Sequence, residues 1–240
     1  MQKNTWIPLA DHPELRVGQY VVPNFISNSV ALAVDEHTHV LVSPGKQLLE
    51  SWPAAKRGDN IDLHIIMPNG FHYMGVPAWQ QAFPNAKLYA SANAIPRLRE
   101  KGIKENGHPD GIRALQSEQP PLPTHYDILF PVGHRAGDIW LRKQTDTSTS
   151  WITCDSFLNY ERYSNQPIAR FLQKKLDAAP GLKLSQVIKF YILNDRKSFK
   201  HWALNQLAQD QPTTLIPSHG EVLQSDTLAQ ALAELLQKRL

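Results

Sequence analysis

The sequence predicts an α/β fold in which two sheets pack face to face and helices cover the outside. Two observations predict this fold class. Strand-like and helix-like segments alternate in both halves of the 240-residue chain, as they do when helices cover a sheet. Hydrophobic residues make up 42% of the chain, which is enough for one sizeable core. We therefore expect residues 1–240 to form a single domain, with the proline-rich stretch 116–124 as a rigid connection between its halves.

Strand signals dominate the first half, and helical spacing separates them. The turn signal Asp35–Thr38 lies between two alternating, β-branched segments, which predicts a hairpin. The segment Ile61–Met67 is apolar except for His64, which is typical of a strand buried on both faces. We expect His64 to be a hydrogen-bonded core histidine. The expected strands are Arg16–Val22, Asn28–Val34, His39–Val42, Ile61–Met67 and Lys87–Ala90, and the expected helices are Lys46–Trp52, Val76–Phe83 and Ile95–Lys101.

The second half changes from strands to helices. Apolar residues recur at three- and four-residue spacing after residue 165, which predicts amphipathic helices. We expect the region of about 165–210 to form a helical cap over the functional edge, or alternatively to provide the apolar contact of a homodimer. The expected strands are Asp127–Val132, Asp138–Arg142, Thr149–Thr153 and Thr213–Pro217, and the expected helices are Asn165–Ala178, Leu184–Leu193, Ser198–Gln209 and Ser225–Arg239.

Composition excludes several functional classes. The 25 basic and 22 acidic residues are interspersed, which is not the pattern of a nucleic-acid-binding surface. The sequence has no run of about 18 apolar residues, so we expect no membrane span. The single cysteine, Cys154, excludes an internal disulfide and a cysteine-rich zinc site. Because the N-terminal segment lacks an apolar signal region, we expect a cytoplasmic protein.

Four potential metal ligands each follow a predicted strand, beside small residues. They are His72, His134, Asp155 and His219. Loops that leave the strands of an α/β sheet converge on one edge, so these side chains are expected to meet there. Three imidazoles and one carboxylate suit a zinc, iron or manganese ion. The alternative interpretation is that each is an ordinary turn residue, because histidine and aspartate are common in loops.

Over residues 15 to 225 the chain resembles the metallo-β-lactamase-fold superfamily, whose members share a four-layer αββα sandwich. The segment Gly133–Ile139 (GHRAGDI) is similar to the family's Gly-His-Thr-Pro-Gly segment, and Pro217–Gly220 (PSHG) to its final Pro-x-His-Gly. Cys154-Asp155 resembles the family's Gly-Asp pair. Ser43 stands where the opening hairpin of the family usually has an aspartate. The order and spacing of these fragments make the resemblance specific as a set.

The main signature of the family, His-x-His-x-Asp-His, is degenerate in this chain. When His72 is aligned with its last histidine, the other ligand positions fall on Met67, Asn69 and Phe71, none of which replaces an imidazole or a carboxylate. The segment Pro68–His72 (PNGFH) is closer to a Pro-Asn-x-x-His form found in an uncharacterised subgroup.

The resemblance also implies how the remaining ligands divide between two metal positions. The residue matching His134 belongs to the first metal, those matching His72 and His219 belong to the second, and the one matching Asp155 bridges both. The second position would keep two imidazoles and one carboxylate, a set that holds one divalent zinc, iron or manganese ion. With His134 as fourth ligand, a single mononuclear centre follows.

The resemblance implies a possible hydrolase that cleaves a small ester or thioester through metal-bound water. The alternative is a catalytically silent scaffold with a binding or regulatory role and no metal in a degenerate site. Four residues near the ligands are candidates for contact with a small-molecule substrate or for support of the ligands: Asn69, Tyr73, Arg135 and Glu221. The competing interpretations are that Tyr73 belongs to the core and that Arg135 forms a surface salt bridge.

Overall fold

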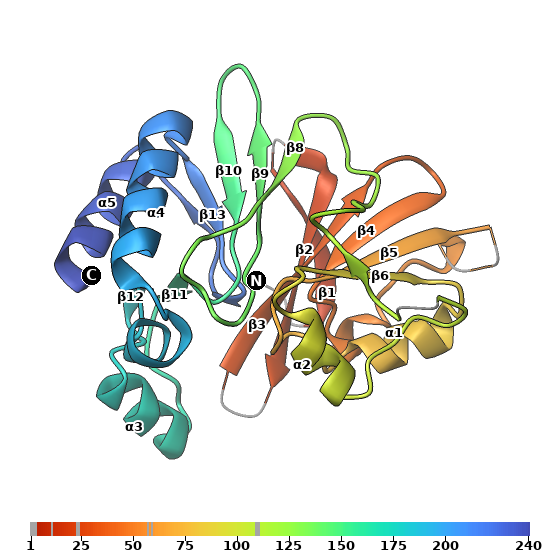
Figure 1. Cartoon of the computed structure of the whole chain (residues 1–240), viewed down its shortest axis with the longest axis horizontal. Coiled ribbons are helices and arrows are strands. Elements are labelled where there is room, and N and C mark those ends of the chain that lie inside the picture. The colour runs from red at the N-terminus through yellow and green to blue at the C-terminus, as the bar shows by residue number, and fades with distance from the viewer. Residues whose placement is uncertain (1–3, 11, 23–24, 57, 59, 109–110) are drawn as a thin grey trace. The chain divides into compact units, whose positions relative to one another are not determined.

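A computed structural model describes residues 4–10, 12–22, 25–56, 58, 60–108 and 111–240 (Figure 1). The chain divides into two compact units, of which unit 1 comprises Met1–Val21 and Ser27–Thr124, and unit 2 comprises Val22–Ile26 and His125–Leu240. The second boundary directly follows the proline-rich stretch 116–124. The stretch itself belongs to unit 1, and the expectation of a single domain over residues 1–240 stays a prediction.

Unit 1 is built from one sheet with short helices. Strands β1 to β4 are antiparallel neighbours in chain order, and β4, β5, β6 and β7 then pair in parallel. Its strands are β1 (Thr5–Leu9), β2 (His12–Val22), β3 (Phe25–Ala33, of which the first two residues belong to unit 2), β4 (Thr38–Val42), β5 (Asp62–Met67), β6 (Lys87–Ala90) and β7 (Arg113–Ala114). Its helices are the 3₁₀ turns η1 (Lys46–Leu48) and η2 (Ala54–Lys56), and the α-helices α1 (Val76–Ala82) and α2 (Ile95–Glu100).

The predicted hairpin and the buried strand are both confirmed. Asp35 Oδ1 accepts hydrogen bonds from the backbone N–H groups of His37 (2.8 Å) and Thr38 (2.7 Å), which closes the turn between β3 and β4. These bonds hold the pKa of Asp35 below its ordinary value. His64 Nδ1 lies 3.0 Å from the hydroxyl of Tyr89, so His64 is the hydrogen-bonded core residue that the sequence predicts.

The predicted helix Lys46–Trp52 is wrong, because the segment forms only a 3₁₀ turn at Lys46–Leu48. The bonds from Leu48 N to Gly45 O and from Trp52 N to Leu49 O have i to i−3 spacing. Pro53 disfavours the α conformation at Trp52. The ring of Trp52 is also held in place, because its Nε1 donates to Lys56 O at 2.8 Å. Side-chain packing therefore determines this segment more than helical spacing does.

Unit 2 contains a five-stranded sheet, a short ribbon and three α-helices. The sheet has the order β15-β13-β10-β9-β8, and β11 pairs with β12 and with β14 in the ribbon. The strands are β8 (Tyr126–Leu129), β9 (Trp140–Gln144), β10 (Thr149–Ile152), β11 (Leu158–Tyr160), β12 (Gly181–Lys183), β13 (Thr214–Ile216), β14 (His219–Gly220) and β15 (Leu223–Gln224). The helices are α3 (Pro167–Lys175), the π-helix η3 (Ile188–Ile192), α4 (Arg196–Asp210) and α5 (Leu228–Arg239).

The core of unit 2 lies between its five-stranded sheet and the paired helices α4 and α5, which run side by side in Figure 1. Trp140 and Trp151, from β9 and β10, pack with Phe199 of α4 in this cluster. Among the described residues, no helix has the length and apolarity that a bilayer crossing needs.

The burial of His39 in unit 1 predicts a pH dependence of stability. The pKa of His39 is lowered from 6.5 to about 4, mainly by burial. The charges of Lys56 and Arg16 also lower it, and the charge of Asp35 partly opposes them. Between these values the unfolded chain binds the proton and the folded chain does not, so stability falls as the pH is lowered from 6.5 to 4. The loss reaches about 3 kcal/mol at most. Denaturant titrations at pH 7 and pH 4 should show a smaller loss in His39→Gln than in the wild type, and an equal loss would contradict the assignment.

Candidate metal centre

Asp155 and His219 are in contact within unit 2. His219 begins β14, directly opposite Leu158 of the parallel strand β11, and Asp155 precedes β11. His219 Nε2 lies 3.1 Å from Asp155 Oδ1, and both side chains are largely buried, with 20% and 15% of their surface exposed. The structure thus brings together two of the four predicted ligands, one imidazole and one carboxylate.

The contact of the other ring nitrogen, Nδ1, shows which nitrogen of His219 carries the hydrogen. His219 Nδ1 lies 3.2 Å from the carbonyl oxygen of Ile26, which is also part of unit 2. A carbonyl only accepts, so Nδ1 carries the hydrogen of the neutral ring and Nε2 carries a lone pair directed at a carboxylate. That arrangement requires a cation, which is either a proton on Nε2 or a metal ion. A backbone carbonyl that holds the second nitrogen is also the usual support of a metal-binding histidine.

Gly220 is required beside His219. It has φ +98°, and a Cβ atom at this position would lie 1.9 Å from the carbonyl oxygen of Asn159. The backbone N–H of Glu221 donates to the same carbonyl at 2.5 Å, so β14 is tightly held against β11. The glycine of the Pro-Ser-His-Gly segment therefore sets where the His219 ring lies.

His134 contacts a different carboxylate, that of Asp138. Its Nε2 lies 3.5 Å from Asp138 Oδ2, which is too long for a good hydrogen bond. Neither ring nitrogen of His134 has a hydrogen-bond partner in the part of the chain that the structure describes, although the side chain is completely buried. A buried imidazole without hydrogen-bond partners calls for an explanation, and a bound metal ion would provide one. This environment therefore fits a metal ligand.

The sequence predicts that Asp138 begins a strand. The strand β9 begins only at Trp140, and Asp138 Oδ2 instead accepts from Ser156 Oγ at 2.8 Å. Ser156 Oγ in turn accepts from Trp140 Nε1 at 3.2 Å. Asp138 lies four residues after His134 and directly after Gly137, but this spacing alone does not distinguish it from the first residue of a strand.

A π-helical turn supports His134 from the opposite side. The sequence predicts a regular helix at Leu184–Leu193, which is wrong: η3 is a π-helix, in which Leu193 N donates to Ile188 O at 2.9 Å. Leu193 forms an isolated antiparallel bridge with His134, and Arg135 N donates to Ile192 O at 3.0 Å. Single π turns are frequent at functional sites, where they re-aim neighbouring backbone.

The Cys154 thiol is buried beside these groups. Burial, and then the carboxylates of Asp155 and Asp138, raise the pKa of the Cys154 thiol well above its ordinary value. A thiol that stays protonated is a poor nucleophile. The side chain packs in the interior.

His72 belongs to unit 1, where the loop after β5 holds it. The side chain of Asn69 accepts from Phe71 N at 2.8 Å, and His72 N donates to Asn69 O at 3.3 Å. His72 Nδ1 lies 2.7 Å from Ser43 Oγ. Ser43 therefore orients His72, and Asn69 shapes the loop.

The remaining candidates have different environments. Tyr73 and Glu221 are half-buried, and Arg135 is exposed. Glu221 is fixed through its backbone, since its carbonyl oxygen accepts from Asn159 Nδ2 at 3.0 Å. A substrate contact of Asn69, Tyr73, Arg135 or Glu221 stays a prediction.

Comparison with solved structures gives extensive matches. DIM-1 metallo-β-lactamase, in a structure exposed to ceftazidime, has a TM-score of 0.62 at 12% identity, and the match covers 99% of both chains. A diflavin flavoprotein fragment from Nostoc sp. PCC 7120 has a TM-score of 0.63 at 16% identity, covering 98% of this chain and 96% of that one. Rubredoxin oxygen:oxidoreductase from Desulfovibrio gigas has a TM-score of 0.63 at 15% identity, and the match covers 98% of this chain but 60% of that one. No family model and no curated sequence matches the chain.

Proposed function

From the metallo-β-lactamase fold of this chain, we propose that it binds one divalent metal ion and hydrolyses a small ester or thioester. The proposed ligands are Asp155, His219 and His72, with His134 as the fourth. Zinc, iron and manganese all suit two or three imidazoles with one carboxylate. A bound ion would supply Lewis acidity to the reaction.

The contact between Asp155 and His219 supports this proposal most directly. The 3.1 Å separation of Nε2 and Oδ1, with Nδ1 fixed on the Ile26 carbonyl, leaves two donor atoms directed at one point. His134 adds an imidazole whose nitrogens have no hydrogen-bond partner among the described residues. In a hydrolase, the role of these groups is to hold the ion while the partly exposed Asp155 and His219 stay accessible to a substrate.

Three positions of the family's His-x-His-x-Asp-His signature hold no metal ligand in this chain, which favours one bound metal ion over two. Met67 is fully buried in β5, the amide oxygen of Asn69 is used by the backbone of its own loop, and Phe71 lies beneath the guanidinium of Arg97 at 4.1 Å. These three side chains serve structure. The loss of these three ligand positions also supports the second candidate function, a catalytically silent scaffold that binds a ligand without metal-dependent turnover.

Metal content separates the two candidates. Protein purified without added metal is expected to carry about one equivalent of zinc, iron or manganese by mass spectrometry. His219→Ala and Asp155→Asn remove a donor each and should lose the ion, whereas His201→Ala, at an exposed histidine of α4, should retain it. Substoichiometric metal that does not change in any variant would favour the silent scaffold.

Turnover is then tested with the same variants. A chromogenic acetate ester and an acyl thioester should be hydrolysed by the wild type and by His201→Ala, and activity should disappear with a chelator and in His219→Ala. Full metal occupancy with no hydrolysis of either ester class would retain the metal centre and reject the proposed hydrolase.

A further inference from the structure

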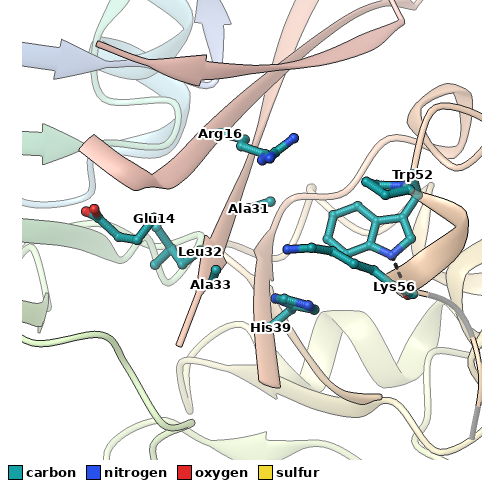
Figure 2. A pocket seen from close by; sticks show the side chains of 9 residues that line it. Glu14, Arg16, Ala31, Leu32, Ala33, His39, Trp52 and Lys56 are labelled. Carbon is teal, nitrogen blue, oxygen red and sulfur yellow. Dashed lines mark hydrogen bonds between the residues drawn. The ribbon is translucent and has the colours of Figure 1, made fainter. Parts of the chain in front are cut away.

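Unit 1 contains a hollow that is lined by two cationic side chains and by none of the predicted metal ligands. It is lined by side chains from β2, β3, β4 and the segment around η2. Its polar lining residues are Glu14, Arg16, His39 and Lys56, and its apolar wall includes Trp52 and Pro53. Figure 2 shows Arg16, Lys56 and His39 around the indole of Trp52.

The two cations of the hollow influence each other. Burial, and then the charge of Arg16, lower the pKa of Lys56. Neither Arg16 nor Lys56 has an ion-pair partner in the described part of the chain. Two partly buried cations that face one space repel each other, and an anion bound between them would lower the free energy of the folded protein.

His39 supplies a buried ring nitrogen in the same lining. The residue is 1% exposed, and its Nε2 has no hydrogen-bond partner among the described residues. Its ring stands at 80° to the ring of Trp52, with 5.6 Å between centroids, so the indole fixes its orientation. A buried ring nitrogen without a partner in a native interior calls for an explanation.

We propose that this hollow is a binding site for a small oxyanion of the phosphate type, held by Arg16, Lys56 and His39. Arginine presents a fork of N–H donors that matches phosphate oxygens, and lysine adds a point charge. The one acidic residue among the lining residues, Glu14, extends away from Arg16 and Lys56 in Figure 2 and has an interaction of its own. Trp52 and Pro53 form an apolar wall on which the organic part of a phosphomonoester would lie.

The experiment titrates inorganic phosphate into the full-length protein by calorimetry at constant ionic strength. Saturable binding is expected in the wild type, with the dissociation constant raised about tenfold or more in Lys56→Gln and in Arg16→Gln, since each loses a charge-assisted contact. Lys101→Gln, at an exposed lysine after α2, is the matched control and should bind like the wild type. Thermal unfolding checks that each variant is folded.

A second readout follows the His39 ring by nuclear magnetic resonance. A bound anion favours the protonated ring, so saturating phosphate should raise the pKa of His39 from its value of about 4. Equal affinity in the wild type, Lys56→Gln, Arg16→Gln and Lys101→Gln would overturn the proposal. So would binding that is lost in His219→Ala but kept in Lys56→Gln, because phosphate would then bind at the proposed metal centre.

Discussion

Replacing Gly220 by alanine is expected to lower the free energy of unfolding by about 2–5 kcal/mol, which combines left-handed backbone strain with overpacking. The added methyl group would meet the Asn159 carbonyl at 1.9 Å, an atom of the β11 backbone that has no free space to move into. Relief of the clash requires β14 to separate from β11. Because His219 lies in β14, the variant should also lose metal.

Gly181→Ala is the matched control for this prediction. Gly181 also lies in unit 2 and has φ +78°, but a Cβ atom there would have nothing within 4 Å. Its cost is therefore limited to backbone strain, about 1–2 kcal/mol. Denaturant unfolding of both variants, with metal analysis, checks the difference. Equal destabilisation with retained metal would show that the close contact at Gly220 is not what holds His219.

Loss of Arg142 is expected to destabilise unit 2 by about 3–5 kcal/mol, because its removal leaves a buried carboxylate without its counter-charge. Asp210 at the end of α4 is 1% exposed at its side chain and accepts from Arg142 Nη1 and Trp151 Nε1, each at 2.9 Å. Burial disfavours the charge of Arg142, but hydrogen bonds to Asp127 and Asp210 outweigh it and raise its pKa. Arg142→Met keeps an apolar stem and removes the guanidinium group, with its charge and its hydrogen-bond donors.

The second partner of Arg142 provides the control. Asp127 lies 2.9 Å from Arg142 Nη2, but its side chain is 56% exposed. Asp127→Asn should therefore cost only about 0–1 kcal/mol. Chemical denaturation of the two variants tests the contrast. If Arg142→Met were as mild as Asp127→Asn, the buried Asp210 would not depend on this ion pair.

The sequence predicts the longer, periodic elements correctly. The hairpin of β3 and β4 follows from the Asp35 turn, and β5 follows from an apolar run that parallel neighbours bury on both faces. The amphipathic pattern of the last helix corresponds to α5. In each case a local pattern and the tertiary environment require the same conformation, so the pattern alone is sufficient.

The failures are in segments whose conformation depends on contacts far along the chain. Strands β11 and β14 have three and two residues, too few for a period, and they exist because they pair with each other across about 60 residues of sequence. Asp138 turns inward because Ser156 donates to it, and a helical pattern at residues 184–193 becomes a π turn against His134.

The sequence predicts only the part of the candidate site that a local pattern identifies. The glycine beside His219 and the strand before it identify a constrained loop end, and the structure places Asp155 in contact with that histidine. The partner of His134 could not be found in this way, because no spacing rule distinguishes Asp138 from the first residue of a strand. The proposal that His72 and His134 share the ion of Asp155 and His219 remains a prediction.

Anomalous X-ray scattering at the zinc, iron and manganese absorption edges tests the central proposal most directly. For crystals of protein that carries its own metal, we predict one anomalous peak at about 2.0–2.2 Å from both Asp155 Oδ1 and His219 Nε2. An anomalous peak at another place in a metal-loaded crystal would contradict the proposed centre. His219 Nε2 would then form only a hydrogen bond with Asp155.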